Sequence, residues 1–377
     1  MALIKLNNRS SEDNAIHGRR NLIINGAMKV AQRGTSATVG PNGTGEGYTV
    51  VDRFQNSLSG SVVSTFSQST DAPSGFANSA KIEITTADTS LGGTEFWHLR
   101  YGFEGQDLQS IAKGTSDAKA LTVSFWVKSN KTGTYTVELQ DIDNSRRNSL
   151  AYTIDSSNTW EHKSITYNPD TTGAFDNDNA QSLRINFWFV AGADFKSGTF
   201  YNGTWAAEDN AKRVHSSQVN LGDTVGNEWY ITGVQMELGE QATPFEHRSV
   251  AEELELCKRY FQKFGGGAGK TIAHVYAPST SELALMFRFA PEMRTTPSVD
   301  WSSDTTDLTY RYNSNNSQNF DRSNLNSDGS LGQVTPQGGA MWIAGWSHGQ
   351  SSGDGGEVRV LGVTPEEFLF IQFDSEL

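Results

Sequence analysis

The sequence predicts a mainly β protein with an N-terminal jelly-roll β-sandwich, a short linking α-helix at about 250–263 and a smaller C-terminal β-sandwich. Segment after segment alternates apolar and polar residues, which is typical of strands with one buried face. The 37 glycines and the 11% share of aromatic residues suit short strands joined by many turns. After Ser249 the apolar spacing changes from two residues to three and four, which marks the predicted helix.

The charge balance and the single cysteine limit the class of protein. The chain of 377 residues has 43 acidic and 30 basic residues, a formal net charge of −13. Binding of nucleic acid requires Lys and Arg gathered on one face, so we expect no such partner. Cys257 alone cannot form an internal disulfide. No secretory leader follows Met1 and no apolar run approaches the ~20 residues that span a bilayer, so we expect cytoplasmic synthesis and no membrane insertion.

Residues 1–20 form a separate N-terminal arm in this prediction. They are polar, carry Lys5, Arg9, Arg19 and Arg20, and keep neither the strand nor the helix period for long. Such a segment is either a disordered tail or a docking peptide that becomes ordered on a partner.

Residues 21–248 form the predicted first sandwich. Segments 121–129 and 134–140 both alternate apolar and polar residues, and the turn-forming sequence NKTG between them predicts a β-hairpin. In segment 228–238 the inward parity shifts at Gly233, which predicts a β-bulge. Antiparallel strands with polar loops and no intervening helix predict a sandwich of jelly-roll type. The same alternation recurs in segments 160–167 and 182–190.

The predicted helix begins with a capping box, in which Ser249 accepts a hydrogen bond from the amide of Glu252. Acidic residues near its start and basic residues near its end match the helix dipole. Gly265 suits the left-handed residue that closes a helix. One apolar stripe follows the helix, and it either packs on its own sandwich or meets copies of the chain at a three-fold axis. The stripe residues, candidates for an oligomer interface, are Val250, Leu254, Cys257, Phe261 and Phe264.

The linking helix and the rest of the chain make up the third predicted part, residues 249–377. Long polar loops separate its strands, and loops on a rigid sheet are where recognition sites are usually found. We therefore expect this part to present a recognition surface. Its predicted strands are 271–277, 282–289, 308–313, 341–346, 357–363 and 367–373.

The sequence contains no motif that establishes catalysis or nucleotide binding. The glycine-rich segment 265–271 has Phe264 where a phosphate-binding loop needs its first glycine, and a predicted helix precedes it. The seven histidines have no zinc-binding spacing, and no G-x-S-x-G elbow occurs. We therefore predict that the protein is not an enzyme and has no cofactor, although its many carboxylates leave a glycosidase as an alternative.

Asp141, Asp143 and Ser145 alternate as ligands do in calcium-binding loops. An EF-hand needs glycine at the sixth position and glutamate at the twelfth, where this chain has Arg146 and Tyr152. The sequence therefore predicts no metal site, with a structural calcium ion in this loop as the alternative.

Six aromatic residues are candidates for contact with carbohydrate. Trp126 and Trp188 lie on the polar parity of their strands, opposite the apolar face. Rings in such positions stack on sugars, or else they are covered by a loop or by a partner chain. The other four lie in or beside polar, glycine-rich segments, where both recognition and core packing remain open. These are Tyr310, Tyr312, Trp342 and Trp346.

Several stretches, in order, resemble a jelly-roll domain found in fibres and other virion proteins of tailed bacteriophages. NLIINGAMKVAQRGTS (21–36) and YTVVDRF (48–54) resemble its opening, and segment 231–261 fits its last strand and the helix beyond it. PEMRTTPSV (291–299) is similar to the start of a C-terminal domain that often follows. MALIKLNNRS (1–10) resembles the segment by which many such proteins attach to the virion.

The resemblance implies a structural virion protein, namely a homotrimeric tail fibre or receptor-binding protein. It implies attachment to other virion proteins through residues 1–20, and location in an external appendage of the virion after synthesis in the host cytoplasm. The jelly roll is similar to carbohydrate-binding modules, which implies recognition of host-surface glycan by the first sandwich or by the C-terminal part, the candidate receptor-binding domain. The alternatives are a head fibre or capsid decoration protein and a glycan-degrading tail enzyme.

Overall fold

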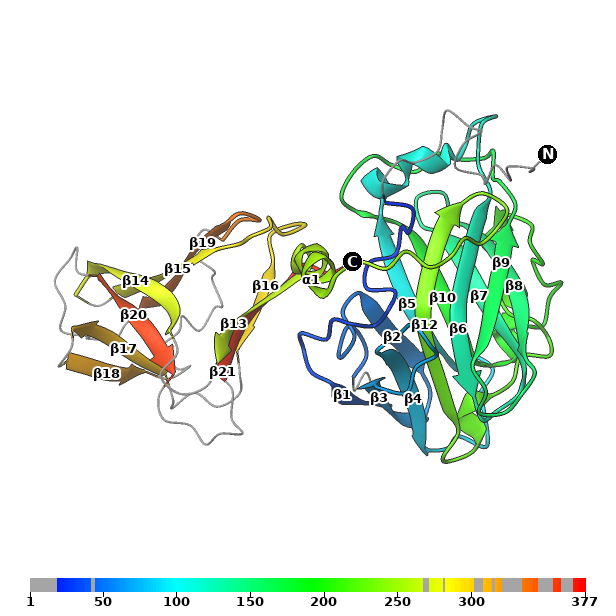
Figure 1. Ribbon diagram of the computed structural model, residues 1–377, viewed down its shortest axis with the longest axis horizontal. Coiled ribbons are helices and arrows are strands. Elements are labelled where there is room, and N and C mark those ends of the chain that lie inside the picture. The colour runs from blue at the N-terminus through cyan, green and yellow to red at the C-terminus, as the bar shows by residue number, and fades with distance from the viewer. Residues whose placement is uncertain are drawn as a thin grey trace, which may run out of the picture. The chain divides into compact units, whose positions relative to one another are not determined.

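The computed structural model describes residues 19–41, 45–266, 271–280, 282–301, 308–313, 316–320, 334–344, 355–360 and 369–377. Apart from Arg19 and Arg20, the predicted arm at 1–20 lies outside these residues. The chain is mainly β, as predicted, and it divides into two compact units (Figure 1). Unit 1 contains Met1–Lys29, Ser36–Gly47 and Phe54–Arg248, and unit 2 contains Val30–Thr35, Tyr48–Arg53 and Ser249–Leu377.

Within its described residues, unit 1 is a sandwich of two antiparallel six-stranded sheets (Figure 1). Sheet A contains, in spatial order, β1 (Ser36–Val39), β3 (Val63–Ser69), β4 (Ser79–Thr86), β12 (Glu228–Leu238), β6 (Leu121–Ser129) and β9 (Glu161–Tyr167). Sheet B contains β11 (Ala206–Ala207), β8 (Arg146–Ile154), β7 (Gly133–Asp141), β10 (Gln181–Ala191), β5 (Phe96–Glu104) and β2 (Phe54–Ser59). Short 3₁₀ helices in the connections are η1 (Gly105–Ile111), η2 (Ala193–Phe195), η3 (Asn210–Lys212) and η4 (Leu221–Asp223).

The core of unit 1 lies between the two sheets. Phe125 of sheet A meets Phe187 of sheet B edge to face, with ring centroids 5.3 Å apart. Phe189 and Trp229 meet in the same way at 4.7 Å. All four side chains are fully buried, and burial of one large apolar side chain contributes about 1.5–3 kcal/mol. The alternating apolar residues of the sequence therefore hold the two sheets together.

The predicted hairpin between segments 121–129 and 134–140 is wrong. β6 pairs with β12 and β9 in sheet A, whereas β7 pairs with β8 and β10 in sheet B. The NKTG segment therefore crosses from one sheet to the other. Both strands bury alternate residues in the same core from opposite sides, so alternation identifies the buried face of a strand but not its partner.

The predicted bulge in β12 is confirmed. The register between β12 and β6 shifts between Thr232 and Gln235, and Gly233 has a φ of 63°. A side chain there would also meet its neighbours, because an added Cβ would lie 2.7 Å from Cζ of Phe76. Glycine is therefore required both by the backbone and by the packing.

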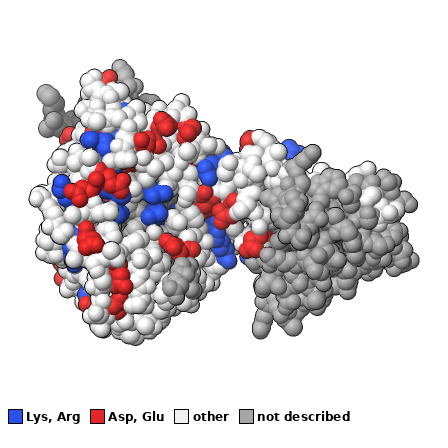
Figure 2. Space-filling model, turned by 180° about the vertical axis from the view of Figure 1, so that it is seen from behind, with Lys and Arg blue, Asp and Glu red and all other residues white. Residues whose placement is uncertain are grey.

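The charges on the surface of unit 1 are mixed. On the face drawn in Figure 2, Lys and Arg side chains lie beside Asp and Glu side chains. Elsewhere in unit 1 side chains of opposite charge also pair: Lys81 Nζ lies 2.7 Å from Glu83 and 2.8 Å from Glu228. No helix among the described residues is long and apolar enough to cross a membrane.

The described residues of unit 2 form a three-stranded and a six-stranded antiparallel sheet. The smaller sheet contains β13 (Phe261–Gly266), β21 (Leu369–Asp374) and β16 (Ser298–Trp301). The larger sheet contains β18 (Asn316–Phe320), β17 (Leu308–Asn313), β20 (Gly355–Val360), β14 (Thr271–Ser279), β15 (Glu282–Arg288) and β19 (Gly338–Ala344). Phe264, Phe287, Phe289 and Phe373 pack together, with neighbouring ring centroids 4.7–6.2 Å apart. Each strand predicted for this part overlaps one of these strands.

The predicted helix is present as α1 (Val250–Lys258) and is capped as expected, with the amide of Glu252 donating to Ser249 Oγ at 3.1 Å. It ends five residues earlier than predicted, because the chain pairs with β21 from Phe261 onward. Phe261 and Phe264 therefore lie in β13. The predicted stripe is not a single helical face, because its alternating spacing of four and three residues continues past the end of α1 into β13.

Candidate functional site

The outward surface of sheet B, which we name the B face, is polar although many of its side chains are buried. The pairing register places these side chains in rows across β8, β7, β10, β5 and β2. The middle row is Ser149, Glu138, Asn186, Arg100 and Gln55. The row on one side is Thr136, Trp188, His98 and Ser57, and the row on the other is Arg147, Gln140, Arg184 and Gly102.

Glu138 is the carboxylate on which several hydrogen-bond donors of the B face converge. Its fully buried carboxylate accepts hydrogen bonds from Arg147 at 2.9 Å and from Arg213 at 2.9 and 3.0 Å. Asn186 Nδ2 and Trp188 Nε1 donate to the same carboxylate at 3.0 and 3.2 Å. Burial alone would raise the pKa of Glu138, but the charges of Arg213 and Arg147 lower it to about 2. Glu138 is therefore ionised at neutral pH and orients four donors.

Trp188 lies on the outward parity, as predicted, but it is only 1% exposed. The chain that follows β10 covers it: the Phe195 ring is 5.4 Å away and the Arg213 guanidinium lies 4.7 Å over the indole. Val214 belongs to the same buried cluster. Of the two arrangements considered from the sequence, the covered ring is the one observed, and Trp188 presents no face to a ligand in this structure.

Arg100 is half-buried and connects three strands of the B face. It donates to Asn186 Oδ1 and to Ser57 Oγ, both at 3.3 Å, and its Nη2 lies 3.0 Å from His98 Nε2. Because a guanidinium only donates, His98 Nε2 accepts and the proton is on Nδ1. Burial and the charge of Arg100 hold the pKa of His98 well below its usual range, so the imidazole is neutral.

Some polar atoms of the B face are buried without a hydrogen-bond partner among the described residues. These are His98 Nδ1, Ser149 Oγ and Arg147 Nε. Buried polar atoms in folded proteins nearly always have a partner, which can be a water molecule or a ligand. Half-buried Gln55 and Gln140 add amide donors and acceptors at opposite sides of the face. Gln55 and Gln140 therefore offer surface groups to a ligand rich in hydroxyl groups, whereas the three buried atoms offer none.

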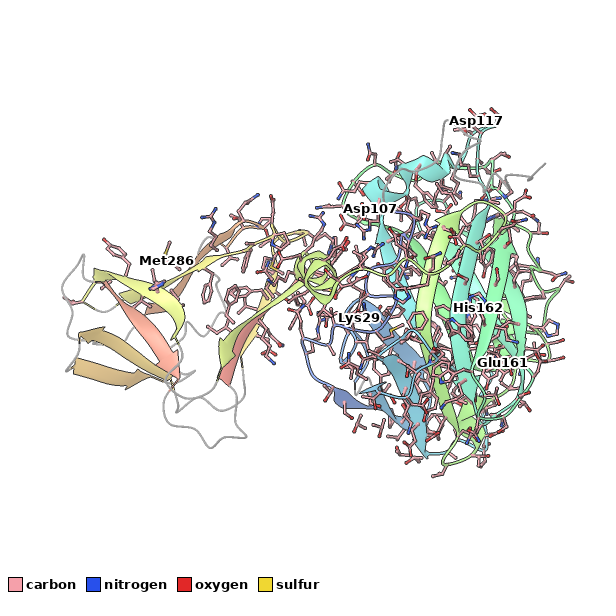
Figure 3. All side chains as sticks on the ribbon, viewed as in Figure 1. Lys29, Asp107, Asp117, Glu161, His162 and Met286 are labelled. Carbon is pink, nitrogen blue, oxygen red and sulfur yellow. The ribbon has the colours of Figure 1, made fainter. Side chains whose placement is uncertain are left out.

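Trp126 is half-buried on the outer surface of sheet A. Its ring centroid lies 5.2 Å from that of His162 on β9, whose position is labelled in Figure 3. A second group of rings belongs to the same unit: Phe76 lies 5.1 Å from both Phe245 and His247. The sequence pattern did not predict this second group of rings, because Phe76, Phe245 and His247 lie outside the strands and follow no period. Trp126 and Trp188 are in different sheets and do not form one site.

The four aromatic candidates of unit 2 are only partly described. The backbone of Tyr310 and Tyr312 lies in β17 and that of Trp342 in β19, strands that are not neighbours in their sheet. The side chains of these three residues, and Trp346 as a whole, lie outside the described residues. Their role in recognition stays a prediction.

The five interface candidates have different environments. Val250 is 58% exposed and Leu254 is half-buried on α1, whereas Cys257 is buried. Phe261 is fully buried beneath the Arg33 guanidinium, 3.8 Å from its ring, and Phe264 belongs to the aromatic core of unit 2. An oligomer interface stays a prediction; Val250 is exposed, Leu254 and Phe264 are half-buried, and Cys257 and Phe261 are buried.

In the loop where the sequence left calcium as an alternative, Asp141 is paired with a lysine. Lys113 Nζ lies 2.6 Å from Asp141, 3.2 Å from Asp170 and 2.7 Å from the carbonyl oxygens of Thr172 and Gly173. The Lys113 side chain is only 2% exposed. An ammonium group thus occupies a cage of four oxygens of the kind that holds hard cations. Across the described ranges, no three His, Cys, Asp or Glu side chains converge on a metal position.

No family model and no curated protein matches the chain. Among solved structures, the enzymatically active domain of tailspike protein 4 of bacteriophage CBA120 is similar, with a TM-score of 0.31 and 14% identity over 58% of this chain and 21% of that chain. The chain therefore spans about a fifth of that protein's length.

Two carbohydrate-binding modules of Clostridium thermocellum are also similar. A family 11 module of a cellulosomal cellulase has a TM-score of 0.27 and 12% identity, over 53% of this chain and 95% of that chain. A family 22 module of a second protein has a TM-score of 0.29 and 10% identity, over 62% of this chain and 99% of that chain. Likenesses at these values assign no family to the chain.

Proposed function

We propose that unit 1 binds carbohydrate on the B face and that the protein is a non-enzymatic adhesion component of a bacteriophage virion. The observation that carries the binding proposal is the middle row of the B face, in which fully buried Glu138 and Asn186 hold half-buried Arg100 in place across three central strands. Sugar hydroxyls both donate and accept hydrogen bonds. Groups that are already oriented bind them with little loss of side-chain entropy.

The virion role is supported by the resemblance to virion proteins of tailed bacteriophages, which extends, in order, over segments 1–10, 21–36, 48–54 and 291–299. In this proposal the protein is a homotrimeric tail fibre or receptor-binding protein that recognises host-surface glycan. Residues 1–20 attach it to other virion proteins. Deletion of residues 1–20 should then remove the protein from assembled particles while leaving its binding to polysaccharide unchanged. Incorporation of the shortened chain at the normal level would contradict this role for the arm.

The test of carbohydrate binding uses the full chain on an array of immobilised bacterial envelope polysaccharides and plant glucans, neutral and acidic. We expect binding to at least one polymer, and at least about tenfold weaker binding after Gln55→Ala or Gln140→Ala, because each removes amide contacts on the B face. Gln241→Ala, an exposed glutamine of unit 1 away from that face, is the matched control. Absence of binding to every polymer, or equal affinity of both B-face variants and the wild type, would contradict the proposal.

A further inference from the structure

Four guanidinium groups gather on or beside the B face. Arg100 and Arg184 come from the neighbouring strands β5 and β10, Arg147 comes from β8, and Arg213 comes from the chain after η3. Arg184 is two residues before Asn186, the residue opposite Arg100. The two are diagonal neighbours, with Cα atoms about 7–8 Å apart for such a pair. Both side chains are half-buried.

These four arginines have different roles. Arg147 and Arg213 are bound to the buried carboxylate of Glu138. Arg100 is oriented by the neutral groups of Asn186, Ser57 and His98, and Arg184 Nε donates to Gln181 Oε1. Arg100 and Arg184 thus bring two half-buried guanidinium groups to the middle of the B face.

All four arginines act on the pKa of the neighbouring His98 imidazole. Burial lowers its pKa most, and the charges of Arg100, Arg213, Arg147 and Arg184 lower it further. The chain as a whole has a formal net charge of −13. A local positive field on an acidic protein attracts anions to one face and leaves the rest of the surface repulsive to them.

The surroundings of the arginines favour a saccharide over a simple anion. Gln55 and Gln140 flank Arg100 and Arg184 in their rows. Neutral amides and hydroxyls bind sugar hydroxyls, whereas a guanidinium fork binds the oxygens of a carboxylate or phosphate in pairs. The B face offers both kinds of group side by side.

We infer that the ligand of the B face is an anionic saccharide, whose carboxylate or phosphate oxygens are bound by Arg100 and Arg184. The inference rests on the proposed function, because it specifies the chemical class of ligand for the same face. The arginines provide the charge contacts and the flanking glutamines bind ring hydroxyls. A neutral polymer with the same linkage lacks the charge contacts and binds more weakly.

The experiment measures binding of the full chain to paired polymers. Alginate, polygalacturonate, hyaluronan and polysialic acid are each placed beside the same polymer with its carboxyl groups reduced to alcohols. A phosphodiester-linked cell-wall polymer and neutral dextran complete the set. We expect at least one anionic polymer to bind about tenfold or more tightly than its neutral counterpart, and this affinity to fall as sodium chloride is raised from about 0.05 to about 0.5 M. The carboxylate and phosphate arms distinguish the two sources of the anion.

Substitutions of arginine test whether the preference for anionic polymers arises on the B face. Arg184→Gln should weaken binding of the anionic polymer by about tenfold while leaving the neutral polymers unchanged, and Arg100→Gln should weaken binding of the anionic polymer by at least as much. Arg288→Gln, which removes an exposed guanidinium from unit 2, should leave both unchanged. Far-UV circular dichroism checks that the variants fold. Arg184→Gln is the second variant because Arg100 ties three strands together and its loss could unfold the sheet.

The outcomes separate the inference from the proposed function. Equal binding of both members of each pair, or binding of neutral polymers alone, overturns the inference and leaves carbohydrate binding standing. Selective binding of an anionic polymer that neither arginine variant weakens also overturns it. Failure to bind any polymer in either set overturns both.

Discussion

At the scale of single residues, two buried carboxyl groups have pKa values that their surroundings shift in opposite directions. Glu138 of unit 1 is held between Arg147 and Arg213, and its pKa is lowered to about 2. Asp52 of unit 2 accepts hydrogen bonds from Gln32, but its burial outweighs the charge of Arg33 and raises its pKa to about 6. The two groups therefore contribute to stability with opposite pH dependence.

Glu138→Gln should destabilise the protein by about 3–5 kcal/mol at pH 7, because it leaves two buried arginines without their counter-charge. Urea unfolding of the full chain, monitored by tryptophan fluorescence, measures this loss. Glu240→Gln, an exposed change of the same kind, should stay within about 0.5 kcal/mol of the wild type. A loss below about 1 kcal/mol for Glu138→Gln would show that the ion cluster does not hold the loop on the B face.

Asp52 gives a pH test with a defined sign. Its folded pKa of about 6 lies above the ordinary value of 3.8, so the folded state binds more protons than the unfolded state between those values. Stability from this group is complete below about pH 4 and is lost as the pH rises through about 6. Asp52→Asn should therefore gain up to about 3 kcal/mol relative to the wild type between about pH 4 and 7. Unfolding measured over this range should show the trend, and a constant difference would contradict the buried environment of Asp52.

The sequence could indicate only part of the B face. It placed Trp188 on the outward parity of its strand, because alternation is a local property. It did not identify Glu138 or Arg213 as buried, because charged residues in strands and loops resemble solvated ones. Their contact joins residues 75 positions apart, and only the folded loop after β10 brings them together.

At the scale of elements, local signals predicted where strands and the helix begin better than how they pair or end. The bulge at Gly233 and the cap at Ser249 depend on neighbouring residues and are confirmed. The pairing of β6 and the end of α1 depend on distant strands, β12 and β21, which override local spacing. The candidate ring of Trp126 could likewise be placed on a face, while its contact with His162 of the paired strand β9 could not.

The cage around Lys113 is an element-scale feature that joins β7 to the loops after η1 and β9. Calcium should leave the Tm of the wild type unchanged, because the ammonium already occupies the four oxygens. Lys113→Ala should lower stability by about 3–5 kcal/mol, since Asp141 and Asp170 lose a buried partner, and millimolar calcium should recover part of its Tm. Lys119→Ala on the same loop is the control. A calcium-dependent Tm in the wild type would contradict the role assigned to Lys113.

At the scale of the whole molecule, the chain does not run through the two units in simple order. Segments 30–35 and 48–53 belong to unit 2, although the sequence pattern gave no sign that they leave the first sandwich. Within unit 2, Arg33 and Arg53 from these segments both pair with Glu376, and Tyr48 donates to the carbonyl of Leu377 at 2.8 Å. These contacts span more than 300 positions, beyond the reach of any local pattern.

The proposed homotrimer belongs to this scale and is tested by light scattering after size exclusion. The full chain should have three times the mass of one copy. Val250→Glu should shift the population to monomer, because Val250 is 58% exposed on α1 and is one of the predicted interface residues. An acidic residue in the first turn favours the helix, so unfolding of α1 would not account for the change. A wild-type monomer would contradict the free-standing trimer and favour a protein that assembles only on the particle.

The central claim is that carbohydrate binds on the B face. Its most direct test is a crystal structure of the full chain with an oligosaccharide cut from the polymer that binds most tightly on the array. We expect sugar density across β7, β10 and β5, in contact with Arg100 and Gln140. Density on the rings around Trp126 instead, or on unit 2 with the B face empty, would contradict it.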